Sequence, residues 1–241
     1  MLEREDEYYS DEVTGLTSSE YTQLKQKMLK SVYQNGGFYV GKYETGIENS
    51  PKTSGSLSTA PTETPVIKQN AYPYNYITCS QAQTLANKME SGNYTSSLMF
   101  GVQWDLILKY LETKGTSQAD LKTDSTTWGN YYNNLWNITN TNSKYAPNGS
   151  GWTSGARGQK KSNSSILLST GASDTFSKQG IYDLAGNVWE WTLEYTSNTS
   201  NPCARRGGHY NYSGGYYPAS SRVVNGATDC SDDVGFRLSL F

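Results

Sequence analysis

The sequence predicts an irregular α+β fold with long loops, and three observations support this prediction. Aromatic residues make up 13% of the 241 residues, and 20 tyrosines and 23 glycines are present. The mean hydropathy is −0.70, because aliphatic residues are scarce. Helix-like patterns alternate with short aromatic, β-branched runs and with long polar segments. A chain of this length can bury a sizeable core, and its aromatic content argues against both a helical bundle and a disordered chain.

Residues 1–35 are predicted to form a charged, frayed lead-in followed by one helix. The lead-in, residues 1–17, is acidic and lacks the apolar stretch of a signal peptide. Thr17 and Glu20 are positioned to cap the start of the helix. Apolar residues recur there at helical spacing, and an Asn-Gly-Gly sequence ends the pattern: Tyr21, Leu24, Met28 and Val32, then residues 35–37.

The main folded domain is expected to span residues 36–241. It begins with a strand over residues 38–46, rich in aromatic and β-branched residues. Residues 47–68 contain many Ser, Thr and Pro, which predicts a long surface loop. A second short strand is predicted over residues 70–78.

Two helices are predicted next, before a long polar region. Ser80 is a suitable cap for a helix over residues 81–89, and a second helix follows over residues 101–114, with Gly115 after it. Residues 116–175 are rich in Asn, Ser and Thr, and loops of this length are usually functional or elaborated surface.

Charge and cysteine content exclude several classes of function. The net charge of −2 gives no electrostatic basis for binding nucleic acid. No apolar run approaches the ~20 residues that a membrane span requires, so no membrane insertion is expected. Three cysteines are too few for a disulfide framework. A bridge between Cys203 and Cys230 and a pair of free buried thiols both remain open from the sequence.

The last quarter contains the most specific motifs. GIYDLAGNVWEWT occupies residues 180–192, RRGG occupies 205–208, and GFR occupies 235–237. With GFYVGKYETG near the start, these blocks resemble the formylglycine-generating enzyme (sulfatase-modifying factor) family. The resemblance covers roughly residues 36–241, poorly over 116–175, and implies a C-type-lectin-like fold.

The same resemblance raises the question of catalysis and argues against it. Enzymes of this family bind copper through two cysteines, and soft Cu(I) requires thiolate ligands. The corresponding positions here are Tyr212 and Tyr217. Related iron-dependent sulfoxide synthases use a histidine cluster, whereas His209 is the only histidine of this chain. No catalytic residue is therefore assigned, and no cofactor is expected to be required.

Retroelement-diversified variable proteins with this fold resemble the chain better. Their templates are randomised at adenines, mostly in AAY codons, which can never then encode Lys, Gln, Glu, Met or Trp. None of these five occurs over residues 209–233, although all occur elsewhere. An ordinary surface loop would also avoid Met and Trp, but the missing Lys, Gln and Glu favour a variable region.

The variable region predicts a ligand-binding face with a composition like that of antibody paratopes, rich in Tyr, Ser, Asn and Gly. Its tyrosines are expected to face solvent. The ligand-binding residues predicted are His209, Tyr210, Asn211, Tyr212, Ser213, Tyr216, Tyr217, Ser220, Ser221, Asn225, Asp229, Ser231, Asp232 and Asp233. The flanking Arg206, Gly207, Gly208, Pro218, Arg222, Gly235, Phe236 and Arg237 are predicted to be framework.

The family resemblance also implies a calcium site. In family members the stretch equivalent to residues 183–190 holds calcium through side chains at Asp183 and Glu190 and backbone carbonyls at Gly186 and Val188. Mixed oxygen donors suit calcium. The alternative is that Glu190 pairs with a framework arginine while the neighbouring tryptophans pack in the core.

The function favoured by the sequence is non-enzymatic: a module that displays a variable face to an unknown protein or surface ligand. Such a module would belong on a phage particle or a bacterial surface. One alternative is a formylglycine-generating-type oxidase, or related metalloenzyme, with an altered metal site. Another is a structural subunit without a variable ligand.

Overall fold

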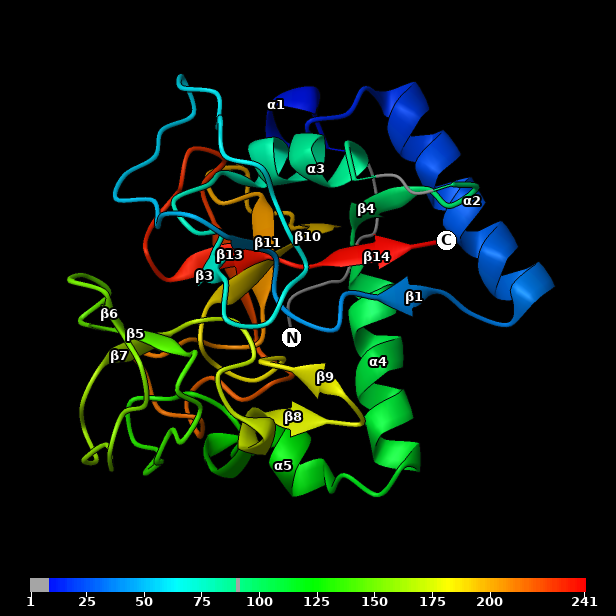
Figure 1. Cartoon of the computed structure of the whole chain (residues 1–241). Coiled ribbons are helices and arrows are strands. Elements are labelled where there is room, and N and C mark those ends of the chain that lie inside the picture. Colours follow the sequence, from blue (N-terminus) through cyan, green and yellow to red (C-terminus); the bar gives the residue numbers. More distant parts are fainter. Residues whose placement is uncertain (1–8, 90–91) are drawn as a thin grey trace.

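The computed structural model describes residues 9–89 and 92–241. Helices lie along one side and across one end of two small central sheets, and long loops fill the opposite side (Figure 1). The helical segments are α1 (Asp11–Thr14), α2 (Ser18–Asn35), α3 (Cys79–Asn87), α4 (Gly101–Thr113), α5 (Gln118–Lys122), η1 (Thr126–Trp128) and η2 (Asp174–Phe176). No helix of this described part is both long and apolar enough to cross a membrane.

Two sheets organise the centre of the molecule. The first has the order β1 (Tyr39–Val40), β14 (Leu238–Leu240), β4 (Ser96–Leu98), with antiparallel pairing throughout. The second has the order β12 (Arg222–Asn225), β11 (Cys203–Arg206), β10 (Trp189–Tyr195), β13 (Val234–Phe236), in which β10 and β13 are parallel. The predicted α+β class, irregular and with long loops, is confirmed.

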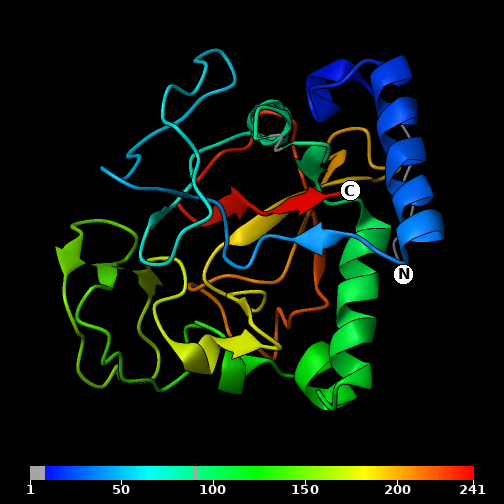
Figure 2. The ribbon, with the colours of Figure 1, turned by 45° about the vertical axis from the view of Figure 1, so that its right-hand side comes forward.

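Smaller strand pairs complete the periphery. They are β2 (Gly46–Ile47) with β3 (Tyr72–Pro73); β5 (Lys144–Pro147) with β6 (Thr153–Ser154) and β7 (Ile166–Leu168); and β8 (Ser177–Lys178) with β9 (Ile181–Tyr182). Figure 2 shows β5–β7 standing apart from the helices α2 and α4, on the loop-rich side.

The two long helices begin and end where the sequence predicts. Thr17 and Glu20 form a reciprocal capping box at the start of α2, and Gly36 ends it in the left-handed conformation, with φ 78°. Tyr21, Leu24 and Met28 are buried along one face. In α4, the Gln103 side chain accepts from the backbone N–H of Phe100.

Several predictions of local structure are wrong. Helix α3 is capped by Thr78, not Ser80, because the Thr78 hydroxyl accepts from the N–H of Gln81. The strand predicted over residues 38–46 is only the two short strands β1 and β2. The strand predicted over 70–78 is only β3, since Pro73 lacks an N–H and Tyr76 has a φ of 52°.

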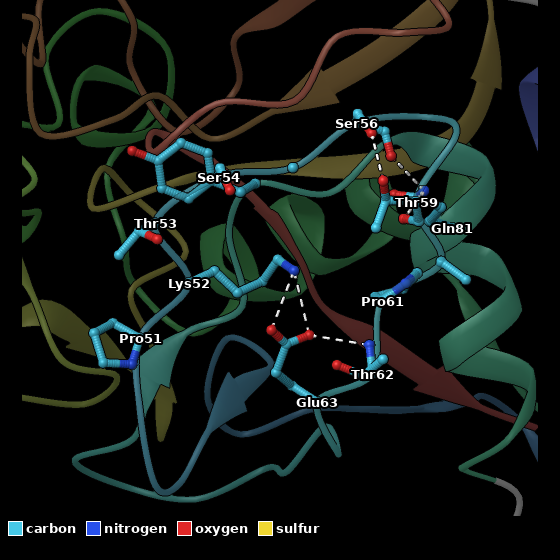
Figure 3. Close-up of a pocket in the computed structure, with 13 residues that line it drawn as sticks. Pro51, Lys52, Thr53, Ser54, Ser56, Thr59, Pro61, Thr62, Glu63 and Gln81 are labelled. Carbon is cyan, nitrogen blue, oxygen red and sulfur yellow. Dashed lines mark hydrogen bonds and ion pairs between the residues drawn. The ribbon is translucent and has the colours of Figure 1, made fainter.

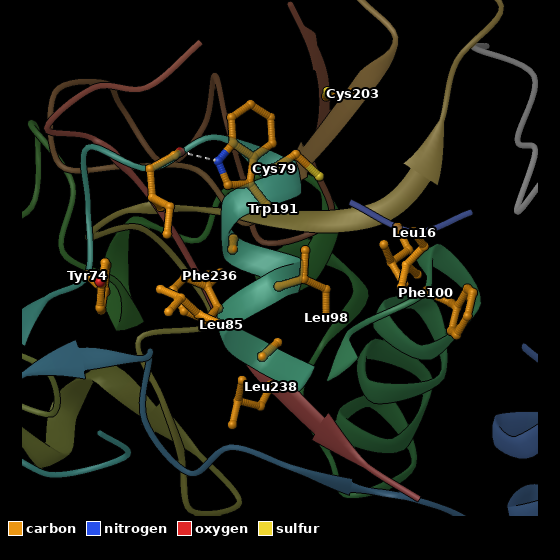
Figure 4. Close-up of a cluster of buried hydrophobic side chains, with 14 of the residues drawn as sticks. Leu16, Tyr74, Cys79, Leu85, Leu98, Phe100, Trp191, Cys203, Phe236 and Leu238 are labelled. Atoms are coloured by element: carbon orange, nitrogen blue, oxygen red, sulfur yellow. Dashed lines mark hydrogen bonds between the residues drawn. The ribbon is translucent and has the colours of Figure 1, made fainter. Parts of the chain in front are cut away.

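The prediction of a frayed lead-in is also wrong for the residues described. Residues 1–8 lie outside the described part, but α1 and the following turn bury Val13 and Leu16 in the main core. That core lies between α3 and the two sheets (Figure 4). Trp191 is at its centre and donates from Nε1 to the carbonyl of Ile77, 2.8 Å away. The division of the chain at residue 35 stays a prediction.

Candidate ligand-binding surface

The predicted variable segment, residues 209–233, leaves the central sheet through two glycines. Gly207 and Gly208 follow β11 with φ values of 95° and 83°. A Cβ on Gly208 would lie 2.3 Å from the carbonyl oxygen of Tyr217, so the chain can turn back on itself only with glycine at this position. The two glycines therefore set the direction in which the segment leaves the sheet.

The backbone of the segment is held by residues outside it. Over its first half, residues 210–220, most of the partners belong to residues 121–133. The hydrogen bonds are Tyr210 N–H to Asn187 O (3.0 Å), Tyr132 N–H to Tyr212 O (2.9 Å), Ser125 N–H to Gly214 O (3.1 Å), Gly214 N–H to Asn133 Oδ1 (3.2 Å), Ala219 N–H to Ser125 Oγ (2.9 Å) and Ser220 N–H to Leu121 O (3.0 Å). None of these bonds uses a side chain of the segment, so they do not depend on the identity of exposed side chains such as Tyr212 and Tyr216.

A series of contacting aromatic rings runs from the buried core to the exposed surface of this segment. Trp189 is fully buried and stacks on His209, with ring centroids 5.5 Å apart. His209 stacks in turn on Tyr212, at 5.2 Å. Tyr212 and Tyr216 are 49% and 67% exposed, and the half-buried Tyr217 packs between Trp189 and both of them. We call Tyr212, Tyr216 and Tyr217 the tyrosine surface.

Two of the predicted surface residues are buried instead. His209 forms the middle of the stack, and Tyr210 is 0% exposed. The Tyr210 ring packs with Val188, and its hydroxyl donates to the Asp232 carboxylate. Burial, followed by the Asp232 carboxylate, raises the pKa of Tyr210. The expectation that Tyr210 faces solvent is therefore wrong, because its ring packs in the core and its hydroxyl has a partner inside the protein.

The remaining predicted residues are spread around this surface. Asp229 is exposed, whereas most of the others are half-buried: Asn211, Ser213, Ser220, Ser221, Asn225, Ser231, Asp232 and Asp233. Asn225 lies in β12 opposite Cys203. The structure thus brings together residues 211–217, whose backbone is hydrogen-bonded to residues 125–133. Their assignment as ligand contacts stays a prediction.

Charged groups support the aromatic stack from beneath. Asp233 Oδ2 lies 2.8 Å from His209 Nδ1, which makes an ion pair when the imidazole is protonated. Burial raises the pKa of Asp233, but His209, Ser231 and Arg205 outweigh it and lower the pKa to about 2. The Arg205 guanidinium lies over the Trp189 ring, 5.0 Å from its centroid. Sequence reasoning missed Arg205, although its place beside the two glycines was visible.

The arginines predicted to be framework hold carboxylates and carbonyls. Arg206 donates to the Asp105 carboxylate and, over 2.9 Å, to the carbonyl of Ser220, which belongs to the segment. Glu194, which is buried, pairs with both Arg206 and Arg222. This network fastens the returning end of the segment to β10, β11 and α4.

The residues predicted to bind calcium lie around a buried ion pair. Both oxygens of Glu190 accept from Arg237, at 2.6–3.0 Å, and Trp189 and Trp191 are buried beside them. Asp183 accepts from the N–H of Gly171, at 2.6 Å. Burial raises the pKa of Asp183 to about 7.

The arrangement of Glu190 and Arg237 is therefore the one expected of the framework alternative. In the described ranges, no group of three or more His, Cys, Asp or Glu side chains is arranged to hold a metal ion. As they stand, the four residues do not fit a calcium ion, because Arg237 occupies both Glu190 oxygens. Calcium binding stays a prediction for Asp183, Gly186, Val188 and Glu190.

The three cysteines are free thiols. Cys203 is buried in β11, and Cys230 is half-buried in the loop before β13. The bridge between Cys203 and Cys230 that the sequence left open is not formed. Cys203 instead approaches Cys79, whose thiol pKa is raised by a hydrogen bond with Cys203 and by burial.

The fold and this surface define a class: an α+β domain in which a rigid framework supports a segment rich in tyrosine. A family model described as "Sulfatase-modifying factor enzyme 1-like domain" matches residues 17–240. The chain belongs to this family, as the sequence resemblance indicated.

The chain was also compared with solved structures and with curated proteins. Among solved structures, the chain is similar to Treponema denticola variable protein 1. The two are 16% identical, the match covers 84% of each chain, and the TM-score is 0.41. A comparison with curated proteins gave no significant match.

Proposed function

We propose that this protein is a non-enzymatic, ligand-binding display module and that the exposed part of residues 209–233 is its binding surface. One observation carries the proposal. The backbone of the segment is anchored by residues 121–133 and Asn187, while Tyr212 and Tyr216 project from it. A surface of this kind can change its side chains without losing its support.

The composition of the tyrosine surface suits recognition. A tyrosine ring offers a large, rigid contact area and loses little rotamer entropy on binding, and Ser, Asn and Gly add adaptable hydrogen bonds. The rings of Tyr212 and Tyr216 already rest on neighbouring rings. Little ordering is therefore left to oppose binding.

A matched pair of substitutions tests the separation of framework and display. The double change Tyr212→Ser and Tyr216→Ser should lower the free energy of unfolding by only about 1 kcal/mol, as exposed substitutions do. Tyr210→Ser, the same chemical change on the same segment, should cost about 3–5 kcal/mol because it empties a buried site. Denaturant unfolding measures both. Equal losses would show that the exposed tyrosines belong to the core, and the display proposal would fail.

Diversification itself is tested in the DNA. We expect a near-copy of the coding sequence for residues 209–233 near the gene, beside a reverse-transcriptase gene. The differences should fall at adenines of the copy and in codons for exposed residues such as Tyr212 and Tyr216. Differences scattered over other bases, or concentrated in the anchoring residues 121–133, would count against the proposal.

The second candidate is a metalloenzyme, and family membership supports it because the matched family is named for an enzyme. Against it, the residues at the two copper positions are Tyr212 and Tyr217, whose rings pack against each other at 5.2 Å. Stoichiometric uptake of Cu(I), together with oxidation of a cysteine in a sulfatase-type peptide, would establish the enzyme and exclude the display module.

A further inference from the structure

A separate hollow lies inside the long loop between β2 and β3. Its volume is about 470 Å3, and it is lined by residues 51–56 and 59–63 together with Tyr76 and Gln81. Figure 3 shows the loop bending around it, with Lys52 and Glu63 on one side and Gln81 on the other. This volume falls within the range of small-molecule sites, about 300–1,000 Å3. Neither the tyrosine surface nor the family motifs include it.

The loop is fixed open by one side chain of α3. The Gln81 amide nitrogen donates toward the carbonyl oxygens of Ser56, Leu57 and Thr59, at 2.8, 3.2 and 3.0 Å. On the opposite wall, the backbone of Gly55 presses so closely on Tyr76 that a Cβ would lie 2.0 Å from the Tyr76 carbonyl oxygen. These contacts determine the shape of the hollow before any ligand arrives.

The wall near Tyr76 and the ion pair are fixed as well. Tyr76 has a φ of 52°, unusual for an aromatic residue, and its N–H donates to the carbonyl of Ser231, 2.9 Å away. Lys52 pairs with Glu63 at 3.2 Å, and the Tyr74 hydroxyl donates to the Glu63 carbonyl at 2.9 Å. Strained backbone persists only where its surroundings enforce it, and such residues concentrate at ligand sites.

The lining is chemically unusual for a pocket of this size. Small-molecule sites are mostly apolar, whereas this one presents hydroxyls, backbone carbonyls and an ammonium–carboxylate pair. Within the described part of the chain, the hydroxyls of Thr53, Ser54 and Thr62 make no hydrogen bond to the protein. They are free to donate to a ligand and to accept from it.

We propose that this hollow binds a small polyhydroxylated ligand of the sugar class. Such a ligand carries both donors and acceptors around each ring, which matches the mixed lining of hydroxyls, Lys52 and Glu63. The half-buried Tyr76 supplies an aromatic side chain in the wall against which a sugar ring can pack. The preformed loop limits the entropy lost on binding. This proposal does not depend on the display function.

A peptide fits the hollow less well. Peptide recognition uses an apolar anchor pocket, a groove for an amphipathic helix or an open sheet edge. Residues 51–63 contain no strand, and their apolar side chains are limited to two prolines, Leu57 and Ala60. A negatively charged ligand is also disfavoured, because Glu63 already neutralises Lys52.

Ligand-observed NMR with free sugars tests the proposal. Saturation transfer from the whole protein to glucose, galactose, mannose and N-acetylglucosamine is measured at millimolar concentration. The triple variant Thr53→Ala, Ser54→Ala and Thr62→Ala removes hydroxyls that hold nothing in the protein, so its melting temperature should stay unchanged. Losing three hydrogen bonds should weaken the binding of the responding sugar about tenfold or more. Ser197→Ala with Thr199→Ala, in the exposed turn after β10, is the matched control.

Each outcome decides the matter. Transfer to at least one sugar that the triple variant loses and the control keeps supports the proposal, and the Tyr212→Ser, Tyr216→Ser variant should also keep it. Transfer to none of the four sugars overturns it, as does transfer that survives the triple change. Loss of transfer in the tyrosine variant alone would place sugar binding on the tyrosine surface instead, and would overturn the assignment to this hollow.

Discussion

Single residues within the segment have opposite roles, although the sequence makes them look alike. Tyr210 and Tyr212 are two positions apart in a run of similar composition. Tyr210 fills the core beside Val188, whereas Tyr212 lies on the surface over His209. The sequence predicted that tyrosines gather here, but not which of them are buried. That depends on contacts with Asp232, 22 residues later in the chain, and with Gly149, about sixty residues earlier, which no local pattern reveals.

At this scale we predict an acid-sensitive contribution from Asp233. Its pKa is 3.8 when unperturbed and about 2 in the folded protein. Between these values the unfolded state binds more protons, so stability falls as the pH falls from about 4 to 2, and the contribution is fully present above that window. A shift of this size corresponds to about 2 kcal/mol.

Asp233→Asn measures that contribution. Denaturant unfolding at pH 5 and at pH 2.5 should show a larger loss of stability for the unmodified protein than for the variant, by about 1.5 kcal/mol. The same change at the exposed Asp229 is the control for removing one charge. If Asp233→Asn loses as much stability on acidification as the unmodified protein does, the ion pair with His209 contributes nothing.

At the scale of elements, the two long helices α2 and α4 were predicted well, whereas the short helix α1 and most strands were not. Helix α2 carries its own signals, a capping box and a terminal glycine, within one stretch of sequence. The strands β1 and β2 have two residues each, and β1 exists only through its pairing with β14 at the other end of the chain. Pairing across two hundred residues leaves no periodicity that a local pattern can show.

The loop of residues 129–134 illustrates an element that sequence reasoning missed. Lys160 is buried, and its ammonium donates to the carbonyls of Tyr131, Tyr132 and Asn134 at 2.8–2.9 Å. Burial lowers the pKa of Lys160 to about 8. The N–H of Tyr132 in turn holds the carbonyl of Tyr212. One buried lysine therefore fixes a loop that supports the tyrosine surface.

We predict that Lys160→Met destabilises the protein by about 3 kcal/mol, because it removes the three charge-assisted hydrogen bonds that the ammonium donates to the carbonyls of the loop. Removing a buried charge recovers part of the desolvation cost, but methionine forms none of the three bonds. Lys161→Met, at the exposed neighbouring position, is the matched control. Urea unfolding compares the two. A loss for Lys160→Met no greater than for Lys161→Met would show that the lysine is not a structural cross-link.

For the whole molecule, the family motifs predicted the buried core correctly, but they gave no information on the segments that lie outside them. Blocks such as GIYDLAGNVWEWT form the buried strands and turns around Trp189 and Trp191. Residues 9–17, without any motif, were expected to be frayed but contribute to the same core. The loop of residues 51–63 looks featureless in sequence because its shape comes from Gln81 and Tyr76, which lie outside it.

The thermal stability of the whole protein tests the calcium prediction. If Asp183 and Glu190 bind calcium, a chelator should lower the melting temperature, and excess calcium should raise it by mass action. Asp183→Asn should abolish the response, while its side-chain oxygen can still accept from Gly171. If the melting temperature changes with neither chelator nor calcium, the calcium prediction is wrong, and the ion pair with Arg237 accounts for Glu190.

The order of the strands along the chain has a consequence for synthesis. Both central sheets are completed by strands that follow the tyrosine-rich segment, β13 beside β10 and β14 between β1 and β4. A premature stop codon or a frameshift anywhere within residues 209–233 would remove both strands, and with them Phe236 and Arg237 from the interior. Folding therefore depends on an intact reading frame through this segment. A chain whose frame is lost there lacks β13 and β14 and cannot complete either central sheet.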